Sequence, residues 1–123
     1  MGAIIIGREP VPDLSPEDVR EWLAHHNDEN GLARAFAAAD NKFWWVEDNK
    51  YDYREGTPEY EKAVRTTNAW GTLMAELKDK IFAILKTEHI NIPETRQIEI
   101  LKPFMERNGY YNGNGWWIPT KYG

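Results

Sequence analysis

Apolar positions recur with helical spacing along most of this chain, and the first such set follows a clear start signal. Ser15 before Pro16, with acids directly after them, is typical of a helix that begins at Pro16 with Ser15 as its N-cap. The next apolar positions have the i, i+3, i+4, i+7 spacing of one buried helix face: Val19, Trp22, Leu23 and His26. The polar run 27–31 is then expected to end this short helix.

A second helical stripe begins after that run, and it predicts a longer helix. Its members share one face: Leu32, Ala35, Phe36, Ala39, Phe43 and Val46. If the helix continues past Val46, a rotation of about 100° per residue places another set on the opposite side. That set consists of Trp44, Asp48, Tyr51 and Glu55.

The third predicted helix is the longest and follows a stop-and-start signal. Gly56 can adopt positive φ, Thr57 can cap a helix, and Pro58 suits its first position. Helical spacing then continues to Glu88, which predicts a length of about 46 Å at 1.5 Å per residue. Because a compact chain of this size is only about 35 Å across, the helix is expected to protrude, bend or break. The weak stretch Thr66–Asn68, with Gly71 after it, marks the expected place.

The last part of the chain predicts a fourth helix and a hairpin. Pro93 opens the helix, Pro103 is expected to kink or divide it, and Asn108-Gly109 ends it. The Asn-Gly steps between the aromatic pairs of 110–118 favour a β-hairpin. The predicted fold class is therefore α+β, mostly α: a bundle of about four helices with a C-terminal β-hairpin, in a single domain over residues 1–123.

Composition narrows the class of protein. The chain has 123 residues, 41% hydrophobic, which suits one folded domain, and it has no cysteine. The absence of thiols excludes a disulfide framework and a cysteine nucleophile, and it favours a cytoplasmic location. The apolar run at 3–6 is too short for a signal sequence or a membrane span. We therefore expect no membrane association.

The charge is unevenly distributed. Net charge is −5; residues 1–61 hold 14 acids against 6 bases, and residues 62–123 hold 6 acids against 9 bases. Nucleic-acid binding requires clustered Lys and Arg that neutralise phosphates. The bases of the second half are scattered singly, so we expect no direct nucleic-acid binding.

The most unusual segment is 40–61, in which six aromatic residues lie among seven carboxylates. One interpretation is a helix packed between two layers, with Trp44 and Tyr51 under the third helix. The other is a surface for a partner protein with a basic surface. Its candidate partner-binding residues are Trp44, Trp45, Glu47, Asp48, Tyr51, Asp52 and Glu55.

The sequence contains no recognisable catalytic or metal-binding pattern. His25 and His26 are adjacent, so on a helix they point about 100° apart and cannot bind one metal as an i, i+4 pair would. His89 lies beside Glu88 in a predicted loop, which is weak evidence for an acid–base pair. No nucleophile elbow or phosphate loop occurs. We predict no enzyme activity, no catalytic residue, no metal and no cofactor.

Three phrases carry a resemblance: FWWVEDNKYDYREGTPEYEKA, NAWGTLM and PFMERNGYYNGNGWWIP. They are similar to small uncharacterised proteins of prophages and mobile elements in Firmicutes. The resemblance implies an inhibitor that occludes a host protein, such as an anti-CRISPR protein that mimics nucleic acid. Two alternatives stay open: a winged-helix regulatory protein that binds nucleic acid through the hairpin, and a structural homodimer that buries Trp44, Trp45 and Tyr51 between copies.

Overall fold

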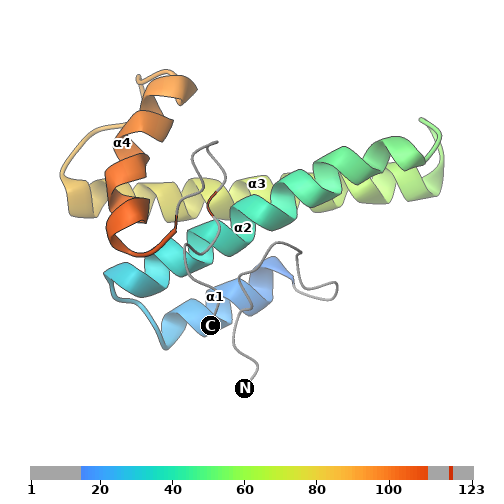
Figure 1. The fold of residues 1–123 in the computed structure, drawn as a ribbon. Helices are drawn as coiled ribbons and strands as arrows, with labels where there is room; N and C mark the ends of the chain where they lie inside the picture. The colour runs from blue at the N-terminus through green and yellow to red at the C-terminus, as the bar shows by residue number, and fades with distance from the viewer. Residues whose placement is uncertain (1–14, 111–116, 118–123) are drawn as a thin grey trace.

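The computed structural model describes residues 15–110 and residue 117 of the chain. Its elements, in order, are α1 (Pro16–Ala24), α2 (Glu29–Asn49), the 3₁₀ turn η1 (Lys50–Asp52), α3 (Pro58–Leu85) and α4 (Glu94–Arg107). Helices α2 and α3 lie side by side and antiparallel (Figure 1). Helices α1 and α4 lie at one end of this pair, and the other end projects away from them.

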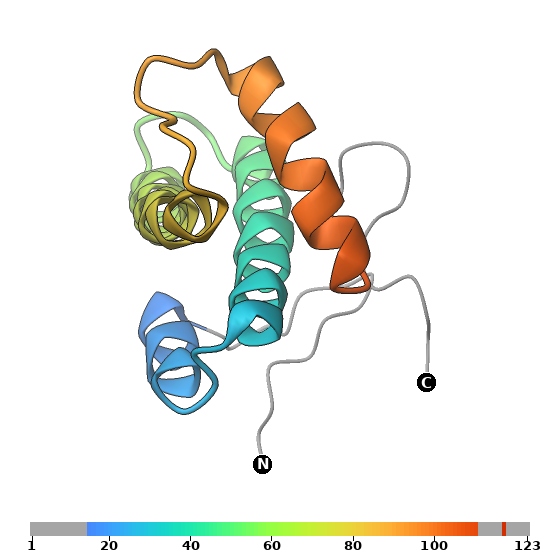
Figure 2. The same ribbon diagram turned by 90° about the vertical axis from the view of Figure 1, so that its left-hand side faces the viewer.

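Helix α2 is central in this arrangement, with α3 on one side and α4 on the other (Figure 2). The predicted stripe from Leu32 to Val46 is buried, except that Phe43 is only partly so. Ala33, Ala37 and Ala38, which lie off that stripe, are buried too. Small alanine side chains allow neighbouring elements to approach α2 closely on several sides, so its first half is enclosed.

The predicted start of α1 is confirmed. Ser15 accepts a hydrogen bond from the backbone of Asp18, whose carboxylate accepts one from the Ser15 N–H, and Pro16 occupies the first turn. Helix α2, however, begins at Glu29, inside the run expected to be only a connection. Asp28 caps it by accepting from the Gly31 N–H at 2.7 Å. A Cβ at Gly31 would lie 1.6 Å from the His26 carbonyl oxygen, so this turn needs glycine.

Helix α3 runs unbroken for 28 residues, so of the three expected outcomes it protrudes. Gly56 has φ +90°, Thr57 accepts from the Tyr60 N–H and Pro58 begins the helix, as predicted. The threonines of the weak stretch do not break it. Thr66 and Thr67 each donate a hydroxyl hydrogen bond to the carbonyl one turn earlier, at 2.9 Å, and the helix continues through them.

Helix α4 is also continuous through Pro103, so of the two expected outcomes, a kink or a division, the division is wrong. Pro103 has no N–H to donate to the carbonyl one turn earlier. Because Pro103 is solvent-exposed, water can hydrate that carbonyl instead. The predicted end is confirmed: Gly109 has φ +90°, and the Tyr110 N–H donates to the Met105 carbonyl at 2.8 Å.

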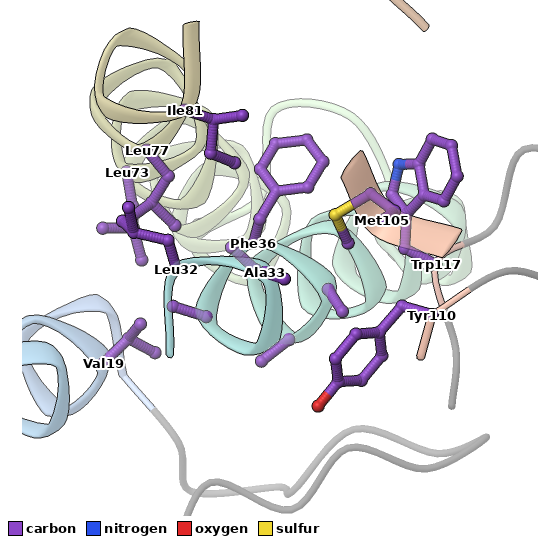
Figure 3. Packing of buried hydrophobic residues seen from close by; sticks show 14 of the residues in the cluster. Val19, Leu32, Ala33, Phe36, Leu73, Leu77, Ile81, Met105, Tyr110 and Trp117 are labelled. Carbon is purple, nitrogen blue, oxygen red and sulfur yellow. The ribbon is translucent and has the colours of Figure 1, made fainter. Parts of the chain in front are cut away.

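The predicted α+β class is wrong for the described part of the chain. Residues 15–110 form four α-helices and one 3₁₀ turn, with no strand. Most of the predicted hairpin, residues 111–116 and 118, lies outside the described residues. Its two described aromatics, Tyr110 and Trp117, are buried in the helical core near Met105 (Figure 3). The aromatic pattern therefore reflects packing against helices as much as strand propensity.

Two ion pairs join the helices where they pack together. Arg20 of α1 meets Glu76 of α3 through two hydrogen bonds of 3.0 and 2.8 Å. Arg107 of α4 meets Glu29 of α2 through two of 2.8 Å, and Asn108 donates a third to Glu29 at 3.0 Å. Hydrogen bonds from Arg107 and Asn108 lower the pKa of Glu29 to about 2.

Candidate partner-binding surface

Exposed aromatic rings in the described part of the chain are confined to residues 44–53. Trp44 is 38% exposed, Trp45 49%, Tyr51 70% and Tyr53 47%. Tyr51 and Tyr53 lie at the projecting end of the α2–α3 hairpin, where α2 turns through η1 toward α3, and Trp44 and Trp45 lie on α2 just before that end. This end, residues 47–61, is called the tip below, and the longer projecting segment, residues 42–65, is called the arm.

The tip is not the continuous helix face that the sequence suggested. Helix α2 ends at Asn49, whose side chain donates to the Trp45 carbonyl at 2.6 Å. The chain then tightens into η1 and becomes extended at Tyr53. Trp44 and Asp48 therefore share a face of α2, whereas Tyr51 and Glu55 leave the helix. The interpretation that places Tyr51 under α3 does not hold, because its ring is the most exposed of the four.

Cations of the chain itself lie against some of the predicted residues. Lys50 Nζ donates a hydrogen bond of 2.9 Å to Glu47 Oε1, and this bond raises the pKa of Lys50. The same ammonium lies 5.3 Å from the Tyr51 ring centroid, and Lys42 lies 5.1 Å from that of Trp45. These local contacts order the rings while leaving large parts of them in solvent.

Apart from Glu47, the acids of the tip are exposed and form no ion pair with any residue that the structure describes. They are Asp48, Asp52, Glu55, Glu59 and Glu61. Residues 47–61 hold six acids against two bases. Over the whole arm the balance is six acids against five bases, because Lys42, Lys62 and Arg65 add positive charge toward the body. Negative charge is thus concentrated at the tip.

A hollow of about 860 Å³ lies beside the tip, between the end of α2, the first half of α3 and the start of α1. Trp45, Tyr53 and Asp52 line one part of it, and Lys62 and Arg65 line another. Two of the four exposed rings, Trp45 and Tyr53, therefore border a concave surface, a shape that can receive a protruding group of a partner.

Each of the three histidines makes a contact within the fold. Trp22 and His26 stack with ring centroids 4.1 Å apart, and His25 caps the end of α1. His89 Nε2 lies 2.6 Å from Asp79 Oδ1 on α3, a different acid from its sequence neighbour Glu88. In the described ranges, no group of three His, Cys, Asp or Glu side chains is placed to hold a metal ion.

Sequence reasoning missed Asp40. Its side chain is only 6% exposed, and its Oδ2 atom has no hydrogen-bond partner. Burial raises the pKa of Asp40 to about 7, although the Trp44 side chain hydrogen-bonds the carboxyl and Lys78 attracts it. The sequence did contain a signal for this burial. Asp40 follows Phe36 and precedes Phe43 at helical spacing, which places its carboxyl group at the edge of the buried stripe.

Comparisons with protein-family models, with curated proteins and with solved structures yield no match to this chain. None of the described helices is long and apolar enough to cross a membrane. The case for function therefore rests on the geometry and charge of this chain.

Proposed function

We propose that this protein is a binding module that captures a partner protein with a basic surface through its tip. The observation that carries the proposal is the concentration of exposed rings and exposed acids at one projecting end. Aromatic rings provide most of the energy at interface centres, and complementary charge speeds encounter. Tyr51 and Tyr53 are the proposed anchors, and Asp48, Asp52 and Glu55 form the charged rim.

The charge pattern favours a localised contact over an extended mimic of nucleic acid. Duplex DNA presents one negative charge per about 1.7 Å along its axis. On this arm the acids gather at the tip, and Lys62 and Arg65 follow directly in α3. The resemblance to prophage proteins suggests that the partner is a host protein, and inhibition would then follow from occluding its basic surface.

The winged-helix alternative is less well supported by the contacts of α4. Arg96 donates to Glu99 at 2.9 Å, and Arg107 is held by Glu29. A recognition helix needs side chains that reach base edges, and these two guanidiniums already have carboxylate partners. The proposed wing lies largely outside the described residues.

The test is affinity capture from a native bacterial host with three forms of the full chain, read by quantitative mass spectrometry. The forms are the wild type, a tip variant carrying Asp48→Lys and Glu55→Lys, and a control carrying Glu21→Lys and Glu106→Lys. The control reverses two exposed acids on α1 and α4, so it matches the change in net charge. Wild type and control should retain the same partner, and the tip variant should lose it.

Equal retention by all three forms would show that the tip is not the contact surface. Mass measurement by light scattering addresses the homodimer alternative in the same samples. A wild-type dimer that the tip variant converts to a monomer would make a second copy of the chain the occupant of the tip, against the proposal of a different partner protein.

A further inference from the structure

A separate cleft of about 430 Å³ lies between α2, α3 and α4, within the size range of small-ligand sites. Its walls are mainly apolar: Phe43 and Trp44 from α2, Met74 from α3, and Ile98 and Leu101 from α4. Asp40 contributes a carboxyl group to this lining. An apolar cleft with one buried acid is a common design for binding a ligand with a polar end.

The carboxyl group of Asp40 is incompletely satisfied. Its Oδ2 atom is closed to solvent and accepts no hydrogen bond, although buried polar groups almost always have a partner. The positive charge of Lys78 lowers the pKa of Asp40, yet the Lys78 ammonium donates its hydrogen bond to Gln97 Oε1 on α4 at 3.0 Å. Gln97 is fixed in turn, because its amide donates to the carbonyls of His89 and Ile92. Lys78 is therefore held toward α4.

We propose that this cleft binds an organic cation, a protonated amine or guanidinium on an apolar stem, with Asp40 as its counter-ion. The stem contacts Trp44 and Met74, and the charged end pairs with the carboxyl group of Asp40, whose buried Oδ2 atom has no donor. An anion is disfavoured because Asp40 and Glu94 both line the cleft. A purely apolar ligand leaves the buried oxygen without a donor. The proposal does not depend on the tip, and the free ligand or a basic side chain of a partner could supply the same chemistry.

The test uses 2-phenylethylamine as the probe and the indole N–H signal of Trp44 in NMR spectra of the full chain. The amine should shift that signal in a saturable way, whereas 3-phenylpropanoate, an anion of similar shape, should not. Asp40→Asn should weaken binding by about tenfold to hundredfold, the range for a hydrogen bond to a charged group. Glu106→Gln, which removes an exposed acid from α4, should leave the affinity unchanged.

The pH dependence provides a second readout. Lys78 from α3 and Glu94 from α4 are the charged groups that line the cleft with Asp40. A cation binds the ionised carboxyl, so affinity should rise about tenfold per pH unit below the Asp40 pKa of about 7 and level off above it. An affinity that is independent of pH between 5.5 and 8.5, or equal in wild type and Asp40→Asn, would overturn the proposal.

Two parallel titrations distinguish the possible sources of the cation. Short blocked peptides with a central Lys or Arg, flanked by alanine, are titrated beside the free amine. Tighter binding of a peptide identifies a partner side chain, and tighter binding of the amine identifies a free small molecule. The tip variant Asp48→Lys with Glu55→Lys should retain amine binding, so a failure of the tip proposal leaves this result intact. No shift with the amine or with either peptide contradicts the cleft site.

Discussion

The two ends of the α2–α3 hairpin are built from the same pair of helices, but they differ in what surrounds them. At the root, residues 29–41 and 66–85, helices α1 and α4 cover the pair and the ion pairs of Arg20 and Arg107 join separate elements. At the tip, the ion pair between Lys50 and Glu47 is local to one turn, and the aromatic rings face solvent. The root stabilises the fold, whereas the tip presents exposed rings and acids to solvent.

This difference separates two uses of aromatic residues in one sequence. Phe36 and Trp70 are buried and belong to the core, whereas Tyr51 and Tyr53 are exposed. Exposed rings that are clustered at one place are unusual for a surface with no partner, because isolated apolar side chains are the normal pattern. The comparison can be tested by changing each end in turn.

The largest expected effect is a contrast in stability between the ends. Phe36→Ala at the root should reduce the free energy of unfolding by about 3–5 kcal/mol, because it leaves a cavity in the core. Tyr51→Ala at the tip should change it by less than about 0.5 kcal/mol, as expected of a surface substitution. Urea denaturation of both variants measures the contrast. A Tyr51→Ala loss approaching that of Phe36→Ala would place the tip ring in the fold.

The second prediction concerns the pH dependence of root stability. The pKa of Asp40 is about 7 in the folded protein, above its ordinary value of 3.8. Between these values the folded state holds more protons than the unfolded chain, so stability should fall as pH rises from about 4 to 7. At 1.36 kcal/mol per pKa unit, the loss reaches up to about 4 kcal/mol above pH 7.

Asp40→Asn should remove this slope, making the variant more stable than wild type at pH 8 and similar to it at pH 4. Glu106→Gln, which changes an exposed acid, should keep the wild-type slope. Denaturation midpoints at pH 4, 6 and 8 provide the comparison. Parallel curves for wild type and Asp40→Asn would mean that the buried carboxyl does not titrate in this range.

A third prediction addresses the turn between α1 and α2. Gly31→Ala places a Cβ against the His26 carbonyl oxygen and should cost about 1–3 kcal/mol as the turn shifts. Gly71→Ala is the matched control, because its Cβ would meet the Phe43 ring at an ordinary 3.4 Å. That control should be neutral or stabilising by up to about 1 kcal/mol, since alanine is the better helix former. Thermal unfolding of both variants distinguishes the two positions, and equal midpoints would contradict the turn account.

The smallest effect is expected at the end of α3. Lys86 has φ 55° in the left-handed region, which costs a non-glycine residue about 1 kcal/mol or more. Lys86→Gly should therefore raise the free energy of unfolding by about 0.5–1 kcal/mol. Lys80→Gly, an exposed site within the same helix, should instead lower it by about 1 kcal/mol. A loss of stability in Lys86→Gly would show that the lysine side chain has a structural role.

Local signals in the sequence predicted the helices well. Ser15 and Pro16 marked the start of α1, Thr57 and Pro58 that of α3, and Gly109 followed the end of α4. These signals depend on neighbours in the chain, so they can be read without tertiary structure. Composition also singled out the aromatic and acidic residues of segment 40–61 as candidates, but the common helix face predicted for Trp44, Asp48, Tyr51 and Glu55 was wrong because α2 ends at Asn49.

The errors arose where distant contacts decide the outcome. The polar run 27–31 was expected to lie between two helices, but α2 already begins within it at Glu29, and the nearby His26 carbonyl makes glycine necessary at position 31. Pro103 does not divide α4, and no hairpin was found among the described residues; Tyr110 and Trp117 pack with the helices instead. Asp40 was missed because its environment comes from α3 and α4, which periodicity within α2 cannot show.

The central claim, that the tip is a binding surface and not part of the core, is tested most directly by one measurement. The rate at which the captured partner dissociates is compared for wild type and Tyr51→Ala by surface plasmon resonance, with Ile90→Ala as the control for truncating an exposed side chain elsewhere. The account predicts dissociation at least about thirtyfold faster for Tyr51→Ala, as for a hot spot of 2 kcal/mol, and no change for Ile90→Ala. Unchanged dissociation from Tyr51→Ala would contradict it.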